Sequence, residues 1–168
     1  GDGVGRLTSA EAYTGTGWTP LPPMPHAADM ATACVLNGRL YVMGGDDSNR
    51  LQVLGMTEEN GLSWSRKADL PAVRRGAALP ARRYGAASTV HEGKIWVMGG
   101  VVDGRGTASV LIFDPETDTW EPAPPLPHSP GTCSATSIEG GAGIHCHGHL
   151  GTFVYRSGAW SVLGQGGS

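Results

Sequence analysis

The strongest potential for chemistry lies in one short segment, Ile144 to His149, with the sequence IHCHGH. Alternate side chains of a β-strand share a face, so a strand here would place His145, His147 and His149 together, about 6.5 to 7 Å apart. Imidazole groups ligate zinc, copper and iron. Cys146 would face the other side, and the pattern identifies no carboxylate partner. Three hypotheses stay open: a transition-metal site, a polar strand without a ligand, and a surface that titrates near neutral pH. No other cofactor is expected.

Two arginine pairs, Arg74-Arg75 and Arg82-Arg83, lie within ten residues of each other. A guanidinium group binds a carboxylate through two parallel hydrogen bonds, so this segment is a candidate contact for an acidic segment of a protein partner. A solvated loop without a partner is the alternative. Weaker candidates for partner contact are the acidic residues of two other polar segments, Asp46, Asp47 and Asp103.

The chain shows none of the common catalytic motifs. It has no G-x-S-x-G segment, no P-loop and no paired carboxylates in a recognisable setting, which favours a binding protein over an enzyme. The three cysteines are an odd number and include no C-x-x-C pair, which argues against a secreted disulfide framework and favours an intracellular protein. We interpret Cys34 and Cys133 as small buried hydrophobic residues.

Composition limits the fold and the partners. The 168 residues include 27 Gly and 12 Pro, which disfavour long helices and indicate an all-β chain. The formal net charge of −3 does not suggest nucleic-acid binding. No apolar run approaches the roughly 20 residues of a membrane-spanning helix. The first residue is Gly1 rather than Met, so we expect either removal of an upstream segment or a longer parent product.

Two hexapeptides 55 residues apart indicate how these residues are positioned. They are LYVMGG (Leu40 to Gly45) and IWVMGG (Ile95 to Gly100), each an apolar strand ending in a glycine pair. A tryptophan, Trp64 or Trp120, follows each pair by 19 or 20 residues and precedes a Leu-Pro step. Repetition at this length predicts an array of similar supersecondary units.

Each repeat contains four candidate strands. The first strand ends at a glycine turn and the second is the hexapeptide. Asn37-Gly38 between two apolar runs predicts a tight hairpin. The third strand is followed by a turn, which is Asp114 to Asp118 in the second repeat, and the fourth strand opens at the tryptophan. The first strands are expected at Thr32 to Leu36 and Ala86 to Val90, and the third at Leu51 to Met56 and Ser109 to Phe113.

Two weaker repeats flank this pair. Ser9 to Tyr13 and Trp18 match only the third and fourth strands of a repeat. Ser134 to Trp160 matches all four in a shortened form. The tryptophans at 18, 64, 120 and 160 are 46, 56 and 40 residues apart, a spacing typical of four-stranded propeller blades.

These features resemble the kelch repeat family. The residues that carry the resemblance are the glycine pairs, the aromatic of the second strand (Tyr41, Trp96), the DPETDTW turn, and tryptophan followed by Leu-Pro. The resemblance implies a kelch-type β-propeller, or a propeller arc, of four-stranded antiparallel blades. It also implies that interblade loops form the interaction face.

The third repeat departs from the family pattern, because Gly148-His149 stands where the other repeats have a glycine pair. Some kelch-like propellers are copper radical oxidases, but the four tyrosines here fall mostly at structural positions.

The expected structural residues of the repeat are its glycine pairs and its tryptophans. One blade cannot bury both of its faces alone, so the tryptophans should act as wedges between blades. The structural set is Gly44, Gly45, Gly99, Gly100, Trp18, Trp64, Trp120 and Trp160.

We predict one kelch-repeat region over residues 1–168. It divides into a half-blade (1–22), a blade (23–71), a blade with an inserted loop (72–127) and a degenerate blade (128–168). Closed propellers have four to eight blades. Further blades outside this sequence, a second chain that completes the arc, and four divergent blades that close are all open explanations.

The predicted function is a non-enzymatic protein–protein interaction scaffold that presents propeller loops, within a larger protein or assembly. Two alternatives stay open. One is a metal-binding protein or metal-dependent enzyme that uses the histidine strand. The other is an architectural subunit that pairs through exposed blade edges.

Overall fold

The computed structural model describes residues 7–45, 48–57, 61–70, 82–138 and 142–163. Regular structure in these ranges consists of β-strands, so the expectation of an all-β chain is confirmed. The described residues contain no helix that is long and apolar enough to cross a bilayer.

A two-stranded sheet forms the N-terminal half-blade. Strands β1 (Ala10–Tyr13) and β2 (Trp18–Leu21) pair antiparallel, with Tyr13 opposite Trp18. The two rings lie 5.6 Å apart between centroids, and both side chains are largely exposed.

Three four-stranded antiparallel sheets follow, and we call them the first, second and third blades. Each runs strand by strand from one edge to the other, as the repeats predict. The first blade contains β3 (Thr32–Leu36), β4 (Arg39–Met43), β5 (Leu51–Thr57) and β6 (Gly61–Lys67). The second contains β8 (Ala87–His91), β9 (Lys94–Met98), β12 (Val110–Asp114) and β13 (Thr119–Ala123). The third contains β14 (Cys133–Ile138), β15 (Gly143–Gly148), β16 (Gly151–Arg156) and β17 (Ala159–Leu163).

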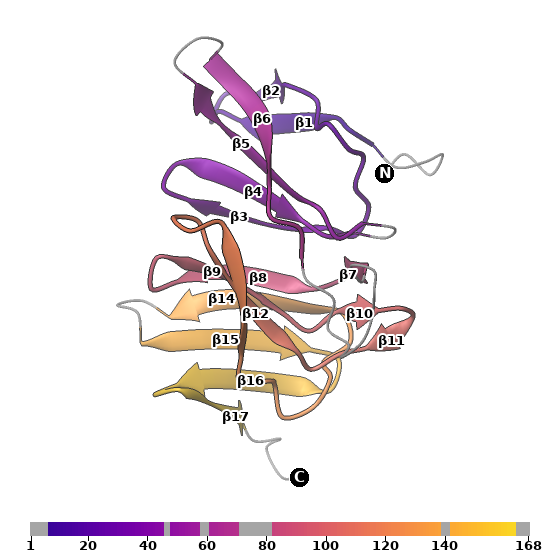
Figure 1. The fold of residues 1–168 in the computed structure, drawn as a ribbon, viewed down its shortest axis with the longest axis vertical. Coiled ribbons are helices and arrows are strands. Elements are labelled where there is room, and N and C mark those ends of the chain that lie inside the picture. Colours follow the sequence, from indigo (N-terminus) through magenta and orange to yellow (C-terminus); the bar gives the residue numbers. More distant parts are fainter. Residues whose placement is uncertain (1–6, 46–47, 58–60, 71–81, 139–141, 164–168) are drawn as a thin grey trace.

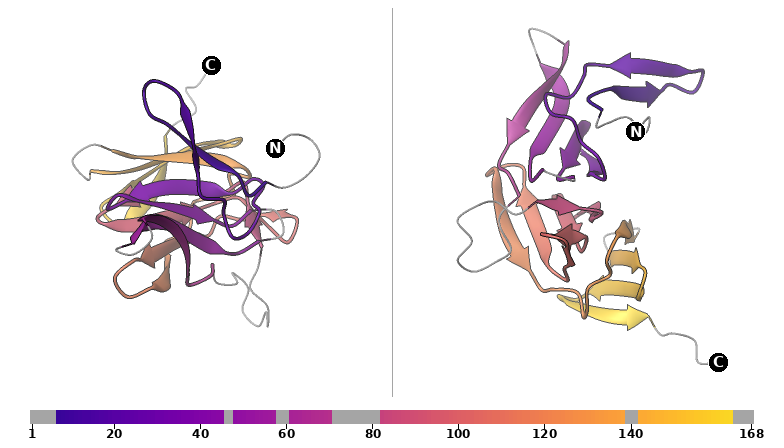
Figure 2. Two further views of the ribbon diagram at one scale, coloured as in Figure 1. Left: turned by 90° about the horizontal axis from the view of Figure 1, so that it is seen from above. Right: turned by 90° about the vertical axis from the view of Figure 1, so that its right-hand side faces the viewer.

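The blades follow one another in chain order along an arc. The right-hand view in Figure 2 shows this curvature, and Figure 1 shows the half-blade at one end and the third blade at the other. The division into units at residues 22, 71 and 127 stays a prediction.

A small additional sheet lies in the second blade. Strands β7 (Arg83–Tyr84), β10 (Val101–Val102) and β11 (Arg105–Gly106) form it in the order β11-β10-β7. The sequence predicted only a polar loop after Gly100, because two-residue strands carry too little alternation to be recognised.

Two tight turns have the backbone that the sequence predicted. Asn37 and Gly38 adopt φ of 50° and 71°, and Glu92 and Gly93 adopt 51° and 72°. These values match the two-residue hairpin turns that fit the right-handed twist of paired strands.

The glycine pairs allow consecutive blades to approach closely. Gly99 has φ of 62°, and a Cβ atom there would lie 2.5 Å from Pro130 Cγ in the connection to the third blade. The Gly45 amide donates to the Arg83 carbonyl at 2.7 Å, and the Gly100 amide donates to Gly131 at 2.9 Å. Each pair therefore connects one blade to the start of the next.

Two apolar seams between the blades form the core. The first seam joins the first and second blades and includes Tyr41, whose ring lies 6.2 Å from that of Phe113. The second seam joins the second and third blades, where Trp96 lies 4.8 Å from Tyr155. Burial of these side chains on both faces of the middle sheet stabilises the stack, since a lone sheet would expose one apolar face to water.

Three tryptophans occupy equivalent places in the stack. Trp64 Nε1 donates to the Pro22 carbonyl at 2.7 Å, Trp120 to Ala68 at 2.8 Å, and Trp160 to Pro124 at 3.0 Å. Each acceptor lies four residues after the tryptophan of the preceding unit. The indoles thus hold each blade to the connection that leaves the one before it.

Candidate interaction surface on the second blade

The small sheet of the second blade brings together several residues that the sequence singled out. Arg83 pairs with Val102, and Val102 pairs with Arg105 on its other side. Arg82 directly precedes β7 and Asp103 directly follows β10. Antiparallel pairing therefore places these two residues at the same end of the sheet. Arg82, Asp103 and Arg105 are exposed.

Arg83 was predicted to contact a partner, and this prediction is wrong because its side chain points into the protein. The residue is only 2% exposed, and its guanidinium donates to the Gly99 carbonyl at 2.8 Å and to Ser109 Oγ at 2.6 Å. Desolvation by burial lowers the pKa of Arg83 to about 10, so the group stays charged at neutral pH. Arg83 is thus an internal anchor between β7 and the ends of β9 and β12. Two adjacent arginines gave no sequence signal for which one would be buried.

The turn that joins β10 and β11 is exposed and tightly formed. Asp103 has φ of 50° and Gly104 has φ of 73°. Thr107 donates its amide to the Gly100 carbonyl at 3.0 Å, which anchors the base of this hairpin at the glycine pair. The remaining predicted contact residues, Arg74, Arg75, Asp46 and Asp47, lie outside the described residues.

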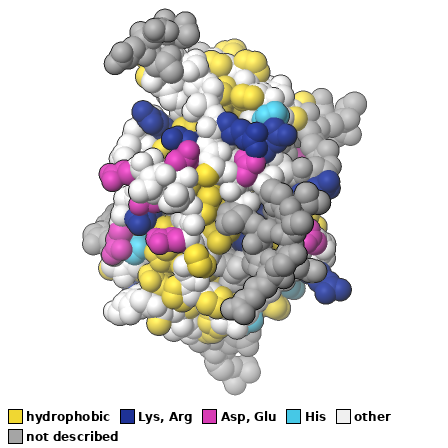
Figure 3. Space-filling model, viewed as in Figure 1, with side chains coloured by type: hydrophobic (Ala, Val, Ile, Leu, Met, Phe, Trp, Pro, Cys, Tyr) yellow, Lys and Arg dark blue, Asp and Glu magenta, His cyan; other side chains and the backbone are white. Residues whose placement is uncertain are grey.

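Charged side chains on the wider surface are mixed in sign. In Figure 3, Lys and Arg side chains alternate with Asp and Glu across the face shown, rather than forming one large basic or acidic field. Lys94, for example, lies 3.2 Å from Asp114 and 3.4 Å from Glu121. Such a surface suits local charge recognition of a protein segment more than long-range attraction of a polyanion.

The histidine segment is arranged differently from the predicted row of three. His145 and His147 lie on β15 with ring centroids 6.0 Å apart, but the strand ends at Gly148 and His149 lies in the following turn. His147 Nδ1 is 3.0 Å from Thr152 Oγ1. Within the described ranges, no group of three or more His, Cys, Asp or Glu side chains is placed to hold a metal ion.

The two histidines occupy positions that are apolar in the other blades. His145 pairs with Val154 as Tyr41 pairs with Val53, and His147 pairs with Thr152 where Met43 pairs with Leu51. The alternate residues of β15, Ile144 and Cys146, lie in the second seam. His145 and His147 therefore face away from the second blade, so the outer face of the third blade is polar where the seams are aromatic and aliphatic.

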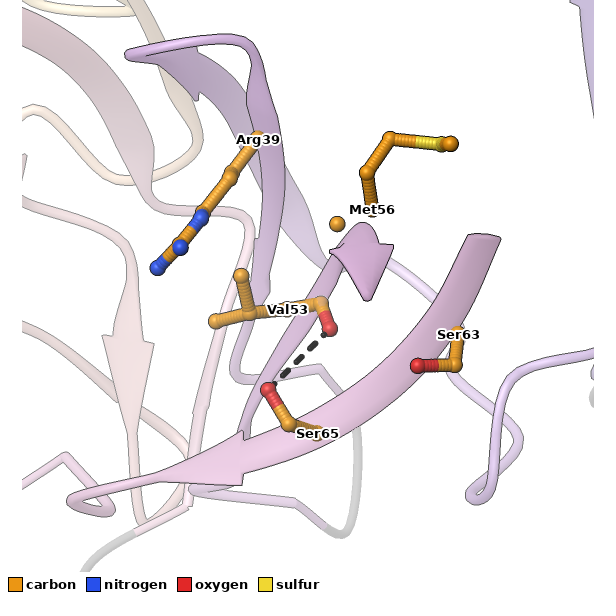
Figure 4. A pocket seen from close by; sticks show the side chains of 6 residues that line it. Arg39, Val53, Met56, Ser63 and Ser65 are labelled. Carbon is orange, nitrogen blue, oxygen red and sulfur yellow. Dashed lines mark hydrogen bonds between the residues drawn. The ribbon is translucent and has the colours of Figure 1, made fainter. Parts of the chain in front are cut away.

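A small pocket on the first blade is a further candidate site. Its volume is about 120 Å³, and Figure 4 shows Arg39 of β4 opposite side chains of β5 and β6. Ser65 Oγ donates to the Val53 carbonyl at 3.5 Å. The lining residues are Arg39, Val53, Gly55, Met56, Ser63 and Ser65.

The lining combines one guanidinium group with two hydroxyls, of which that of Ser65 already has an acceptor in the Val53 carbonyl. Gly55 is the one feature of the sequence that could have indicated this pocket, because glycine inside a strand indicates close approach of another group. A Cβ atom at Gly55 would lie 3.3 Å from Arg39 Cγ.

Comparison with known proteins places this geometry in context. A Kelch motif model matches residues 29–54 and 82–127. The chain is 28% identical over 172 residues to Kelch-like protein 35 of Mus musculus, covering 98% of this chain and 28% of that protein. It is 32% identical over 120 residues to the F-box protein AFR of Arabidopsis thaliana, covering 66% of this chain and 29% of that protein. The chain thus spans less than a third of either relative.

A solved structure has the same fold. A fungal alcohol oxidase of the AA5 family, in complex with copper, superimposes with a TM-score of 0.64 at 18% identity. The match covers 84% of this chain and 32% of that protein. At this identity the likeness concerns the propeller architecture alone.

Proposed function

Because the chain belongs to the kelch repeat family, we propose that it is a non-enzymatic scaffold that binds a protein partner through the loops of its second blade. The observation that carries this proposal is the contrast between neighbouring arginines. Arg83 is buried and ties the loop base to the glycine pair, while Arg82 and Arg105 are exposed beside it. A rigid base under exposed charged residues supports binding, since little loop entropy is lost when a partner docks.

The proposed partner presents an acidic segment. The exposed guanidinium groups of Arg82 and Arg105, with Arg74 and Arg75 of the preceding connection, would pair with its carboxylates. Asp103, Asp46 and Asp47 would select against competing acidic segments and accept a basic residue of the correct partner.

Charge reversal tests this surface directly. Immobilised wild-type chain and the variants Arg82→Glu and Arg105→Glu are incubated with a cell lysate, and captured proteins are quantified by mass spectrometry. We expect each reversal to reduce recovery of the specific partner by about tenfold or more, because like charges then oppose docking. Arg156→Glu, an exposed reversal on the third blade, is the matched control and should leave recovery unchanged. Equal recovery by all four proteins would remove the second-blade surface from consideration.

A second proposed role is assembly through the half-blade. Trp18 is 69% exposed and Tyr13 is 61% exposed, although the three equivalent tryptophans are held at seams between blades. Exposed aromatic pairs of this kind are characteristic of association surfaces. The partner at this face would be another blade, from this protein or from another subunit.

Sedimentation velocity over a range of concentrations tests the second role. The wild-type chain should self-associate, and Trp18→Gln should lower the association constant by roughly tenfold, since it removes an aromatic anchor. Leu150→Gln, which changes another exposed apolar residue at a turn, is the control. A wild-type chain that stays monomeric at every concentration would contradict self-assembly through this face.

A further inference from the structure

Two cysteines lie next to each other in the third blade. The β14–β15 register places Cys133 opposite Gly148 and Ala135 opposite Cys146. The two cysteines thus occupy diagonal positions on one face of the sheet. Both thiols are free, and a hydrogen bond joins them. This pair could not be predicted from the sequence, because twelve intervening residues separate its members.

The two thiols differ in their access to solvent. Cys146 is completely buried in the second seam, beside Ile144 and Phe153. Cys133 is only partly buried and lines an open pocket of about 390 Å³ together with Thr132, Ser134, His147 and Gly148. A small solute therefore reaches Cys133 first. Cys133 also packs against the second seam, as the sequence suggested for a small hydrophobic residue, but it is only partly buried there.

The surroundings of Cys133 favour its thiolate. The neutral Cys133 thiol donates to the Met98 carbonyl oxygen at 3.3 Å, at the end of β9, and ionisation gives up this hydrogen bond. The hydrogen bond from the Cys146 thiol is the main cause that lowers the pKa of Cys133, and the nearby backbone of Ala87 and the Arg83 charge add to it against the opposing effect of desolvation. Desolvation raises the pKa of the isolated Cys34 to about 11. Cys133 should therefore react faster than Cys34, and Cys34 can serve as the reference thiol within the same chain.

We propose that Cys133 and Cys146 are a reversible dithiol site that hydrogen peroxide oxidises to a disulfide. The Cys133 thiolate attacks one peroxide oxygen, the O–O bond breaks, and the sulfur becomes a sulfenic acid while the other oxygen leaves as water after protonation. The Cys146 sulfur then attacks the Cys133 sulfur. The S–S bond forms, the S–O bond breaks, and the hydroxyl leaves as a second water with the Cys146 proton.

The position of this site gives oxidation a consequence for the fold. Disulfide formation withdraws the Cys133 sulfur from the Met98 carbonyl and from the region of Arg83, which is the anchor of the β7–β10–β11 sheet. Cβ atoms must come within about 4.5 Å for the bond, so β14 shifts slightly at its first residue. Oxidation would therefore alter the seam directly beneath the proposed contact surface, although the site itself does not depend on that function.

Peptide mapping of the wild-type chain tests the proposal without any variant. The reduced 168-residue chain is treated with limiting hydrogen peroxide, alkylated, digested and analysed by mass spectrometry. We expect a peptide pair cross-linked between Cys133 and Cys146, reversed by dithiothreitol, with Cys34 still alkylated. Oxidation of Cys34 as fast as Cys133, or oxidation without this cross-link, would overturn it.

Two further measurements separate the roles of the thiols. Below pH 8, iodoacetamide should label Cys133 at least about tenfold faster than Cys34, because the thiolate is the reacting form. In Cys146→Ser the sulfenic acid should persist at Cys133 and react with dimedone, while Cys34→Ser should leave the disulfide yield unchanged. Equal labelling of Cys34 and Cys133, or failure to trap a sulfenic acid in Cys146→Ser, would show that the pair is inert.

Discussion

Adjacent arginines at the start of the second blade have opposite environments. Arg83 is 2% exposed and donates to the Gly99 carbonyl and to Ser109, while Arg82 is exposed. Leaving a buried donor or acceptor without its hydrogen-bond partner lowers the free energy of unfolding far more than a substitution at the surface does. The two residues should therefore affect different properties of the protein.

We expect Arg83→Met to lower the free energy of unfolding by roughly 2–4 kcal/mol, since it leaves the Gly99 and Ser109 acceptors without their donor. Urea unfolding followed by tryptophan fluorescence measures this change. Arg82→Met is the matched control and should stay within about 0.5 kcal/mol of wild type. A stable Arg83→Met protein would show that the buried anchor is unnecessary.

The sequence predicted only some of the residues on the exposed surface of the second blade. Arg82 and Asp103 are exposed, and the fold brings them to one end of a small sheet. Burial of Arg83 could not be predicted, because it depends on carbonyl groups contributed by β9 and β12. Nor could the sequence anticipate that β15 ends before His149, since strand ends follow from pairing with a neighbour rather than from local pattern.

Glycine pairs control the contact between elements. Gly100 has φ of 82° and faces the Tyr84 carbonyl, whereas Gly93 has φ of 72° in a turn where an added Cβ would meet nothing within 4 Å. Both positions require left-handed backbone, but only Gly100 also lies against another segment. Comparison of the two positions separates backbone strain from steric exclusion.

We expect Gly93→Ala to destabilise the chain by about 1 kcal/mol and Gly100→Ala by roughly 3 kcal/mol or more, because the second change adds a clash with backbone atoms. Thermal unfolding monitored by circular dichroism measures both. Equal losses in the two variants would mean that the glycine pair is needed for its backbone conformation alone.

Strands were the most predictable elements. The expected first strand Thr32 to Leu36 coincides with β3, and most other boundaries differ by one or two residues. Alternation and turn residues specify these strands locally. The β10–β11 hairpin was missed, because its two-residue strands are defined by pairing with β7 rather than by their own pattern.

At the scale of the whole molecule, one contact recurs along the arc. Trp64, Trp120 and Trp160 each donate to a carbonyl in the connection leaving the preceding unit. The sequence predicted that tryptophans wedge between blades, and their spacing indicated a repeated unit. The shared hydrogen bond was not predictable, since its acceptors are Pro22, Ala68 and Pro124, which have no common side-chain chemistry.

Trp64 and Trp120 lie at equivalent seams, so the stacked-blade arrangement requires that their indoles be protected to a similar degree. Hydrogen exchange of the indole N–H groups, measured by NMR on the 168-residue chain, tests it directly. Trp64 and Trp120, whose indole hydrogen bonds are partly buried, should exchange slowly and at similar rates, while the exposed Trp18 should exchange at the rate of a free indole. Trp160 should lie between them, because its bond to Pro124 is exposed. Exchange of Trp64 or Trp120 as fast as that of Trp18 would contradict the stacked-blade arrangement.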